Sequence, residues 1–131
     1  MVQLTTRRVT VCAESFFQPN YSDPLAAKYV FAYRIRITNI GEEKVQLLSR
    51  TWVVTDGAGE ERYVEGEGVV GQQPEIMPGH THEYTSWVQF ETPIGAMRGS
   101  YGMLRTYANG RQEEFEAVVP RFLHTAPEVL N

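Results

Sequence analysis

The chain has 131 residues, of which 42% are hydrophobic and 21% charged, and a formal net charge of −4. This length suits one domain with a single core, and an acidic chain with no basic cluster longer than Arg7-Arg8 is not expected to bind nucleic acid in general. No stretch approaches the roughly 20 apolar residues of a membrane helix. Residues 1–8 lack an apolar core and a small-residue cleavage site, so we do not expect a secretory signal. The lone Cys12 agrees with a reducing compartment. We therefore expect a single cytoplasmic domain over residues 1–131, without a membrane partner.

The first elements in chain order are strands separated by a loop. Residues 9–13 predict a strand, and residues 18–24, with two prolines, predict a loop. Residues 29–37 alternate strictly, which is typical of a strand with one buried face. We expect Tyr29, Phe31, Tyr33, Ile35 and Ile37 to face the core, and Val30, Ala32, Arg34, Arg36 and Thr38 to face solvent.

The remaining elements continue this pattern. We expect a strand or a bulged pair over 44–55, then short strands over 61–65, 80–90, 99–107 and 112–119. The turn signals are Asp56-Gly57-Ala58-Gly59, Pro78-Gly79, Thr92-Pro93-Ile94-Gly95 and Asn109-Gly110, the last read as a two-residue type I′ hairpin turn. The tail 120–131 is expected to lie over one end. Turns at this spacing, without helical periodicity, predict an all-β antiparallel sandwich of about seven or eight strands.

Residues 66–71, Gly-Glu-Gly-Val-Val-Gly, have the glycine spacing of a phosphate-binding loop. The helix that normally completes such a loop is not predicted, because Gln72-Gln73-Pro74 follows. One interpretation is structural: a wide connection whose Val69 and Val70 dock on the edge of the core. The other is a nest of backbone amides that binds pyrophosphate or a nucleotide phosphate. The residues of this anion site would be Gly66, Gly68 and Gly71, helped by Arg62 or Arg98.

The charge around this loop bears on the second interpretation. Glu65 and Glu67 would repel an anion. A divalent cation that bridges the carboxylates and the phosphate would reverse that effect. If the loop binds an anion, we therefore expect Mg²⁺ or a similar ion to assist.

His80 and His82 lie two residues apart on a predicted strand, so their imidazoles would share one face and could bind a transition metal. A third ligand would have to come from elsewhere, for example from His124. Histidines that face solvent are the simpler interpretation. Trp52 is expected in the core, whereas Trp87 is a candidate anchor for a partner protein. No arrangement of nucleophile and base is apparent, so an enzyme is not expected.

Several stretches, taken in order, resemble the ApaG family of small bacterial proteins. They are Tyr29-Val30-Phe31-Ala32-Tyr33, Val45-Gln46-Leu47-Leu48-Ser49-Arg50, Trp52, residues 66–71 with Gln73-Pro74, Pro78-Gly79, Tyr84-Thr85-Ser86, Glu91-Thr92-Pro93 and Met97-Arg98-Gly99-Ser100-Tyr101. The resemblance implies an immunoglobulin-like or fibronectin type III-like sandwich and a protein-binding role without known enzymatic activity. It also implies an indirect link to cobalt resistance and magnesium efflux, and hence Mg²⁺ or Co²⁺ as the divalent ions to consider. This chain has Arg105-Thr106-Tyr107-Ala108 where many relatives carry acidic residues, which argues against a metal site at that hairpin.

Two functional hypotheses remain. The first is a non-enzymatic module that binds an unidentified protein partner through a sheet face or edge. The second is a small-anion binder that uses residues 66–71 with a divalent ion.

Overall fold

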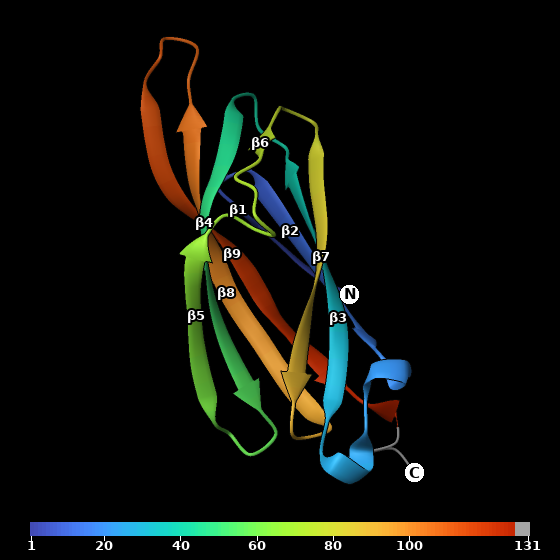
Figure 1. Ribbon diagram of the computed structural model, residues 1–131. Coiled ribbons are helices and arrows are strands. Elements are labelled where there is room, and N and C mark those ends of the chain that lie inside the picture. The colour runs from blue at the N-terminus through green and yellow to red at the C-terminus, as the bar shows by residue number, and fades with distance from the viewer. Residues whose placement is uncertain (128–131) are drawn as a thin grey trace.

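The structure, a computed structural model, describes residues 1–127. Two antiparallel sheets pack face to face, as Figure 1 shows. One sheet has the order β1-β2-β3-β7, and the other β5-β4-β8-β9 with the short β6 also paired to β4. The bounds are β1 Val2–Thr6, β2 Val9–Phe17, β3 Tyr29–Asn39, β4 Lys44–Asp56, β5 Glu61–Glu67, β6 Glu75–Ile76, β7 Thr81–Phe90, β8 Ile94–Thr106 and β9 Gln112–Thr125. The predicted all-β sandwich is confirmed.

The core lies between the two sheets because each contributes one apolar face. Phe31, Ile35 and Ile37 of β3 are fully buried and face fully or almost fully buried residues of the other sheet such as Leu47 and Tyr101. One side of the sandwich is closed where β1 approaches β9: the Val118 amide donates to Thr6 Oγ1 at 3.4 Å. On the other side the edge strands β5 and β7 face each other without pairing.

The alternation of β3 holds for all five residues predicted to face the core, although Tyr29 is only partly buried. It fails for Val30 and Ala32, which were expected to face solvent and are 7% and 6% exposed. Ala32 is aligned with Phe16 on β2 and with Trp87 on β7, so large neighbours cover it. Val30 is covered by the loop 18–22, which is anchored to its backbone. On the outer face, cross-strand neighbours thus bury Ala32 and a loop buries Val30.

The structure has more strands than predicted, nine in residues 1–127. The sequence analysis missed β1, because β1 is exposed over most of its length and has no buried face to produce a signal. It also missed the two-residue β6. The strand predicted over 99–107 begins earlier, at Ile94, so the turn before it spans fewer residues than the Thr92 to Gly95 signal suggested.

The prediction that the tail from residue 120 lies over one end was wrong up to Thr125, because β9 continues through Pro120 to that residue. Pro120 is tolerated there for two reasons. β9 is an edge strand, and the β8–β9 register shifts between Met97 and Gly99, so that Pro120 falls in a bulge. The prediction for residues 128–131 lies outside the described residues.

The turn at Asn109-Gly110 exists but is of another type. Gly110 has a φ of +87°, whereas Asn109 is not among the residues with positive φ. The Gly110 amide donates to the Tyr107 carbonyl at 2.9 Å and the Tyr107 amide to the Arg111 carbonyl at 2.8 Å. This is a three-residue loop ending in a left-handed glycine rather than a two-residue type I′ turn.

Candidate functional site

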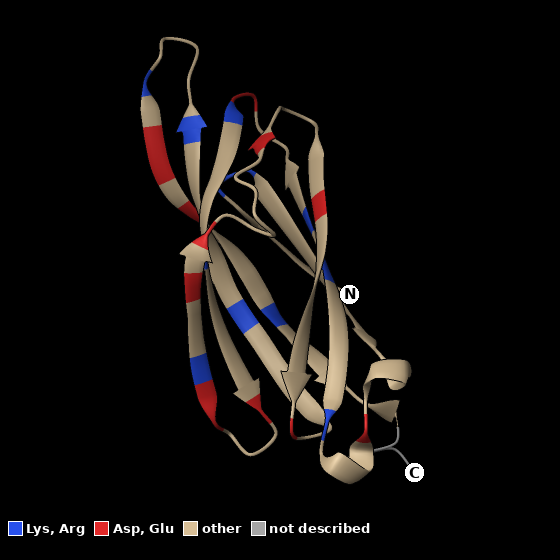
Figure 2. Cartoon of the chain, viewed as in Figure 1, with Lys and Arg blue, Asp and Glu red and all other residues tan. Residues whose placement is uncertain are grey.

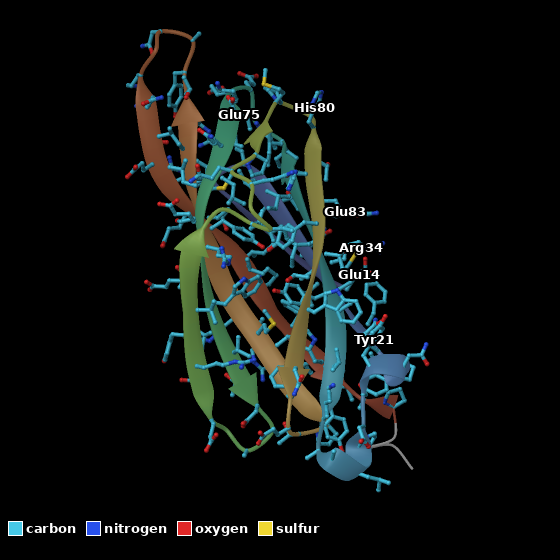
Figure 3. All side chains as sticks on the ribbon, in the orientation of Figure 1. Glu14, Tyr21, Arg34, Glu75, His80 and Glu83 are labelled. Carbon is cyan, nitrogen blue, oxygen red and sulfur yellow. The ribbon has the colours of Figure 1, made fainter. Side chains whose placement is uncertain are left out.

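The outer face of the β1-β2-β3-β7 sheet carries three exposed aromatic side chains that come from different elements. Trp87 of β7 is 50% exposed, Phe16 of β2 is 41% exposed and Tyr21, from the 3₁₀ turn Pro19–Tyr21, is 61% exposed. Tyr21 packs edge-on against Trp87 with ring centroids 5.2 Å apart. Phe16 and Trp87 flank Ala32 in register across β3. We call Phe16, Tyr21 and Trp87 the aromatic patch; Figure 3 labels Tyr21 within it.

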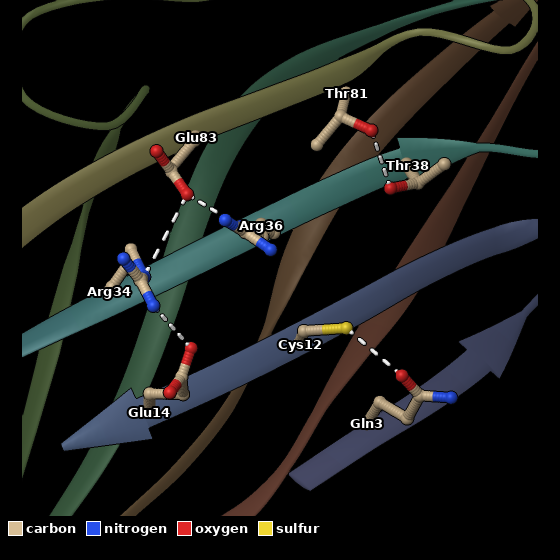
Figure 4. A network of polar contacts seen from close by, with 8 residues as sticks. All are labelled: Gln3, Cys12, Glu14, Arg34, Arg36, Thr38, Thr81 and Glu83. Atoms are coloured by element: carbon tan, nitrogen blue, oxygen red, sulfur yellow. Dashed lines mark hydrogen bonds and ion pairs between the residues drawn. The ribbon is translucent and has the colours of Figure 1, made fainter. Parts of the chain in front are cut away.

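A network of charges borders the aromatic patch. Arg34 Nη2 lies 2.7 Å from Glu14 Oε1, and the Arg34 guanidinium carbon lies 5.4 Å from the centre of the Phe16 ring. Arg36 Nε lies 2.5 Å from Glu83 Oε1. Figure 4 shows that these four residues form one chain of contacts across three strands. The hydrogen bond from Arg34 lowers the pKa of Glu14, and that from Arg36 lowers the pKa of Glu83.

Exposed aromatic rings surrounded by paired charges have the composition of a protein-binding surface. Such surfaces concentrate tryptophan, tyrosine and arginine at the centre and keep polar groups at the rim. Trp87, which the sequence suggested as a partner anchor, lies at the centre of this patch. Tyr21 and Phe16 were missed, because only the folded loop and the register of β2 bring them beside Trp87.

The glycine loop uses several of its amides internally. The Gly68 amide donates to the Leu48 carbonyl at 2.9 Å, and the Val69 amide to the Gln72 carbonyl at 2.8 Å. Val69 is buried, as the structural interpretation predicted, whereas Val70 is 64% exposed. Gly68 and Gly71 have positive φ angles, which is what the structural interpretation of this loop requires.

The structure does not bring Arg62 or Arg98 to the glycine loop. Arg62 is paired with Val54, whereas Gly66 is paired with Arg50 four positions along β4. At roughly 3.3 Å per residue this separates Arg62 from Gly66 by about 13 Å. Arg98 is aligned with Val53 on the far side of β4, and its Nη2 lies 3.8 Å from Glu61 Oε2. Anion binding by the loop amides stays a prediction without help from these two side chains.

Arg50 is the cation that the fold places at this loop. Its Nη1 donates to the Glu67 carbonyl at 3.1 Å and to the Gly68 carbonyl at 3.0 Å. The sequence analysis missed this contact, because it depends on the register of β4 against β5 and not on spacing along the chain.

His124 lies apart from the other two histidines. His80 is exposed and precedes β7, as Figure 3 shows, and His82 is half-buried on the inner face, where burial lowers its pKa. His124 is fully buried on β9: its Nδ1 lies 2.6 Å from Ser15 Oγ, and its ring packs on Phe31. His124 packs on Phe31, whereas His82 is paired with Ile37, further along β3. At roughly 3.3 Å per residue, His82 and His124 are about 20 Å apart, so His124 does not supply a third ligand. Over residues 1–127 no group of three or more His, Cys, Asp or Glu could hold a metal ion.

The comparisons with known proteins agree with one family. The ApaG domain matches residues 19–105. Protein ApaG of Aromatoleum aromaticum is 46% identical over 124 residues, covering 95% of this chain and 94% of its own length. Protein ApaG of a Bradyrhizobium strain is 45% identical, covering 98% and 95%.

The chain belongs to the ApaG family. A crystal structure of a protein from Bordetella pertussis, named an ApaA protein, superposes with a TM-score of 0.84 at 45% identity, covering 91% of this chain and 94% of that one. The match extends over nearly the full length of these relatives, so the sandwich is the fold that ApaG proteins share. No helix in the described part of the chain is long and apolar enough to cross a membrane.

This ApaG chain has a buried arginine beside the hairpin of β8 and β9. Arg105 is 5% exposed, and its guanidinium carbon lies 4.5 Å from the centre of the Phe115 ring. Its Nη2 donates to the Arg7 carbonyl, and its Nη1 lies 3.9 Å from Glu113 Oε1. A cation held in this way repels a second cation, so this hairpin does not suit a metal.

Proposed function

We propose that this chain is a non-enzymatic interaction module of the ApaG family, which binds a partner protein through the aromatic patch of Phe16, Tyr21 and Trp87. The observation that carries the proposal is the exposure of Trp87. Its indole is 50% exposed, whereas Trp52 in the core is 3% exposed. Burying the exposed part of a large aromatic side chain on a partner yields more binding free energy than burying most other residues.

The backbone beside the patch supports the same function. β7 is an edge strand, paired only with β3, so its outer edge can accept a strand from another protein. Trp87 lies in the middle of that strand. A partner that adds a strand to β7 would therefore have its own side chains next to the indole. Strand addition supplies affinity through the main chain, and the aromatic patch supplies selectivity.

We place the module in the cytoplasm, in agreement with its lone Cys12. The link to cobalt resistance and magnesium efflux is assigned to the partner that the module binds. This chain then affects cation levels without holding the cation itself.

Paired variants test the proposal. Wild-type protein, Trp87→Ser and Tyr63→Ser are immobilised and exposed to lysate of the source bacterium, and the captured proteins are then purified and titrated. Tyr63 is a matched control, because it is 68% exposed but lies on β5 of the other sheet. We expect Trp87→Ser to weaken the complex at least about tenfold, or about 1.4 kcal/mol, and Tyr63→Ser to leave it unchanged. Equal affinity of all three proteins would contradict the proposal.

A further inference from the structure

The open side of the sandwich contains a groove between the edge strands β5 and β7. Its volume is about 340 Å³, within the range of small-molecule sites. The walls combine apolar side chains, among them Trp52, Val64 and Val88, with polar ones that include Arg50 and Ser86. No Asp or Glu side chain among the described residues lines it. Figure 2 shows the contrast between the charged strand β5 and the lower half of β7, which carries no charge.

Two arginines without a counter-ion among residues 1–127 line this groove, Arg62 and Arg50, and Arg50 is the one fixed at the glycine loop. It takes part in none of the ion pairs formed by residues 1–127. The hydrogen bonds of the described part of the chain engage only its Nη1, which donates to the carbonyls of Glu67 and Gly68. The Nε and Nη2 donors therefore remain for a ligand. This edge of a guanidinium matches the two oxygens of a carboxylate.

The fold holds this guanidinium in a fixed place. A Cβ on Gly66 would lie 2.8 Å from Nη1, 2.9 Å from Cζ and 2.9 Å from Nη2 of Arg50, so the flat face of the guanidinium rests on the glycine backbone. With one face on Gly66 and Nη1 fixed by two carbonyls, the side chain has lost most of its freedom before any ligand binds. Preorganisation of this kind lowers the entropic cost of binding.

The neighbouring hydroxyl groups do not neutralise the charge. Tyr101 is aligned with Arg50 across the sheet, and its hydroxyl lies 2.5 Å from that of Tyr84. Burial raises the pKa of both phenols, and the nearby Arg50 only partly opposes this effect. Both therefore stay protonated near neutral pH. Tyr33 and Ser86 line the groove, and neither hydroxyl has a hydrogen-bond partner among the described residues, so both can donate to a bound anion.

We propose that the groove between β5 and β7 binds a small organic carboxylate, whose oxygens accept hydrogen bonds from Nε and Nη2 of Arg50 and whose apolar body packs against Trp52, Val64 and Val88. A carboxylate matches the free edge of Arg50, because Nε and Nη2 present two parallel donors to its two oxygens. The other arginine at the groove, Arg62, lies at its far end and donates to the Gln89 carbonyl at 3.3 Å. The groove borders the aromatic patch, because Trp87 also lines it. Carboxylate binding at Arg50 does not require the proposed partner, so the two proposals can fail independently.

A titration of the full chain with 3-phenylpropionate, followed by ¹H–¹⁵N NMR, tests the site. 3-Phenylpropanamide has the same apolar body without the negative charge. Phenyl phosphate carries a phosphate group in place of the carboxylate. We expect saturable shifts of the Arg50 Nε–H signal and of the amides of Gly66 to Gly68 with the carboxylate. The amide should bind at least about tenfold more weakly, which is the discrimination expected from a charged hydrogen-bonding pair. Equal affinity for the amide, or tighter binding of phenyl phosphate, would overturn the proposal.

Variants locate the binding. Arg50→Gln removes the positive charge, and Gly66→Ala places a methyl group where the Arg50 guanidinium lies and so displaces it. We expect each to weaken binding of 3-phenylpropionate at least about tenfold. Arg98→Gln is the matched control, because this exposed arginine pairs with Glu61 outside the groove, and it should leave the affinity unchanged. Retained affinity in a folded Arg50→Gln protein overturns the proposal. If that variant does not fold, the Arg50 Nε–H signal of the wild-type protein decides the question by itself.

Discussion

The guanidinium of Arg50 rests on the backbone of Gly66, at a place where a Cβ would lie 2.8 Å from Nη1. This contact explains why a glycine stands at position 66 without any reference to a phosphate. The other two glycines of the loop serve the turn, since Gly68 and Gly71 have φ angles of +63° and +74°. The spacing that resembles a phosphate-binding loop therefore has a structural cause at each of its three glycines.

Alanine at positions 66 and 68 should affect stability differently. Gly66→Ala meets the end of a flexible side chain, and we expect it to lower the free energy of unfolding by about 1 kcal/mol through the loss of the Arg50 hydrogen bonds. Gly68→Ala meets the Gln72 carbonyl oxygen at 2.2 Å and requires a positive φ, so we expect a loss of about 2–4 kcal/mol. Urea unfolding measures both. Equal losses would show that the loop backbone is more adaptable than the structure indicates. Because Gly68→Ala is expected to destabilise the fold, a loss of ligand binding in this variant would not show that Gly68 contacts the ligand.

His124 should make stability fall below pH 6.5. Burial lowers its pKa from 6.5 to about 4, so the folded protein holds it neutral while the unfolded chain binds a proton there. Its contribution is fully present above pH 6.5 and is lost progressively as the pH falls toward 4. By pH 4.5 we expect a loss of about 2–3 kcal/mol in the free energy of unfolding.

Urea unfolding from pH 4.5 to 7.5 measures this loss. His124→Gln should flatten the profile, and His80→Gln, at an exposed position, serves as the control. An unchanged slope in a folded His124→Gln protein would assign the pH dependence to other groups.

The turn between β1 and β2 places two arginines in the left-handed region. Arg7 and Arg8 have φ angles of +50° and +66°, where a side chain is disfavoured by about 1–2 kcal/mol. An ion pair favours arginine at position 7, since Arg7 Nη2 lies 2.5 Å from Glu113 Oε1. Arg8→Gly should therefore raise the free energy of unfolding by about 0.5–1 kcal/mol, whereas Arg8→Ala, which keeps the Cβ, should not. Thermal unfolding compares the two, and a gain with alanine equal to that with glycine would refute the strain argument.

Truncation of the two tryptophans should lower the free energy of unfolding by very different amounts. Trp52 is 3% exposed and packs against Tyr33, Tyr101 and Phe122, so Trp52→Ala should cost about 3–5 kcal/mol. Trp87→Ser should cost about 1 kcal/mol or less, because half of its surface already contacts water. Chemical denaturation gives both values. A large loss at Trp87 would mean that the aromatic patch serves folding rather than binding.

The sequence predicts those features that depend on local periodicity. The alternation over 29–37 indicates β3 and its buried face, and Trp52 is recognisable as a core residue. Contacts that depend on register are not predictable in this way. Arg50 meets Gly66 only because β4 and β5 pair in one particular alignment, and no spacing between positions 50 and 66 encodes it.

The candidate interface shows the same limit. Trp87 can be proposed from the strand pattern, since it lies on the face opposite Tyr84 and Val88. Tyr21 and Phe16 join it through a loop and a neighbouring strand that the sequence does not connect to it. At Pro120 a local signal is misleading. Proline usually ends a strand, but here a bulge on the edge strand β9 accommodates it.

The central claim is that the chain binds a protein through its aromatic patch, and the most direct measurement is an NMR titration of the isotope-labelled chain with the purified captured partner. We predict that the indole N–H of Trp87 and the amides of β7 and of the turn around Tyr21 shift or broaden, while the indole N–H of Trp52 and the amides of β9 stay in place. A footprint confined to the opposite sheet, with the Trp87 signal unchanged at saturation, would contradict the account.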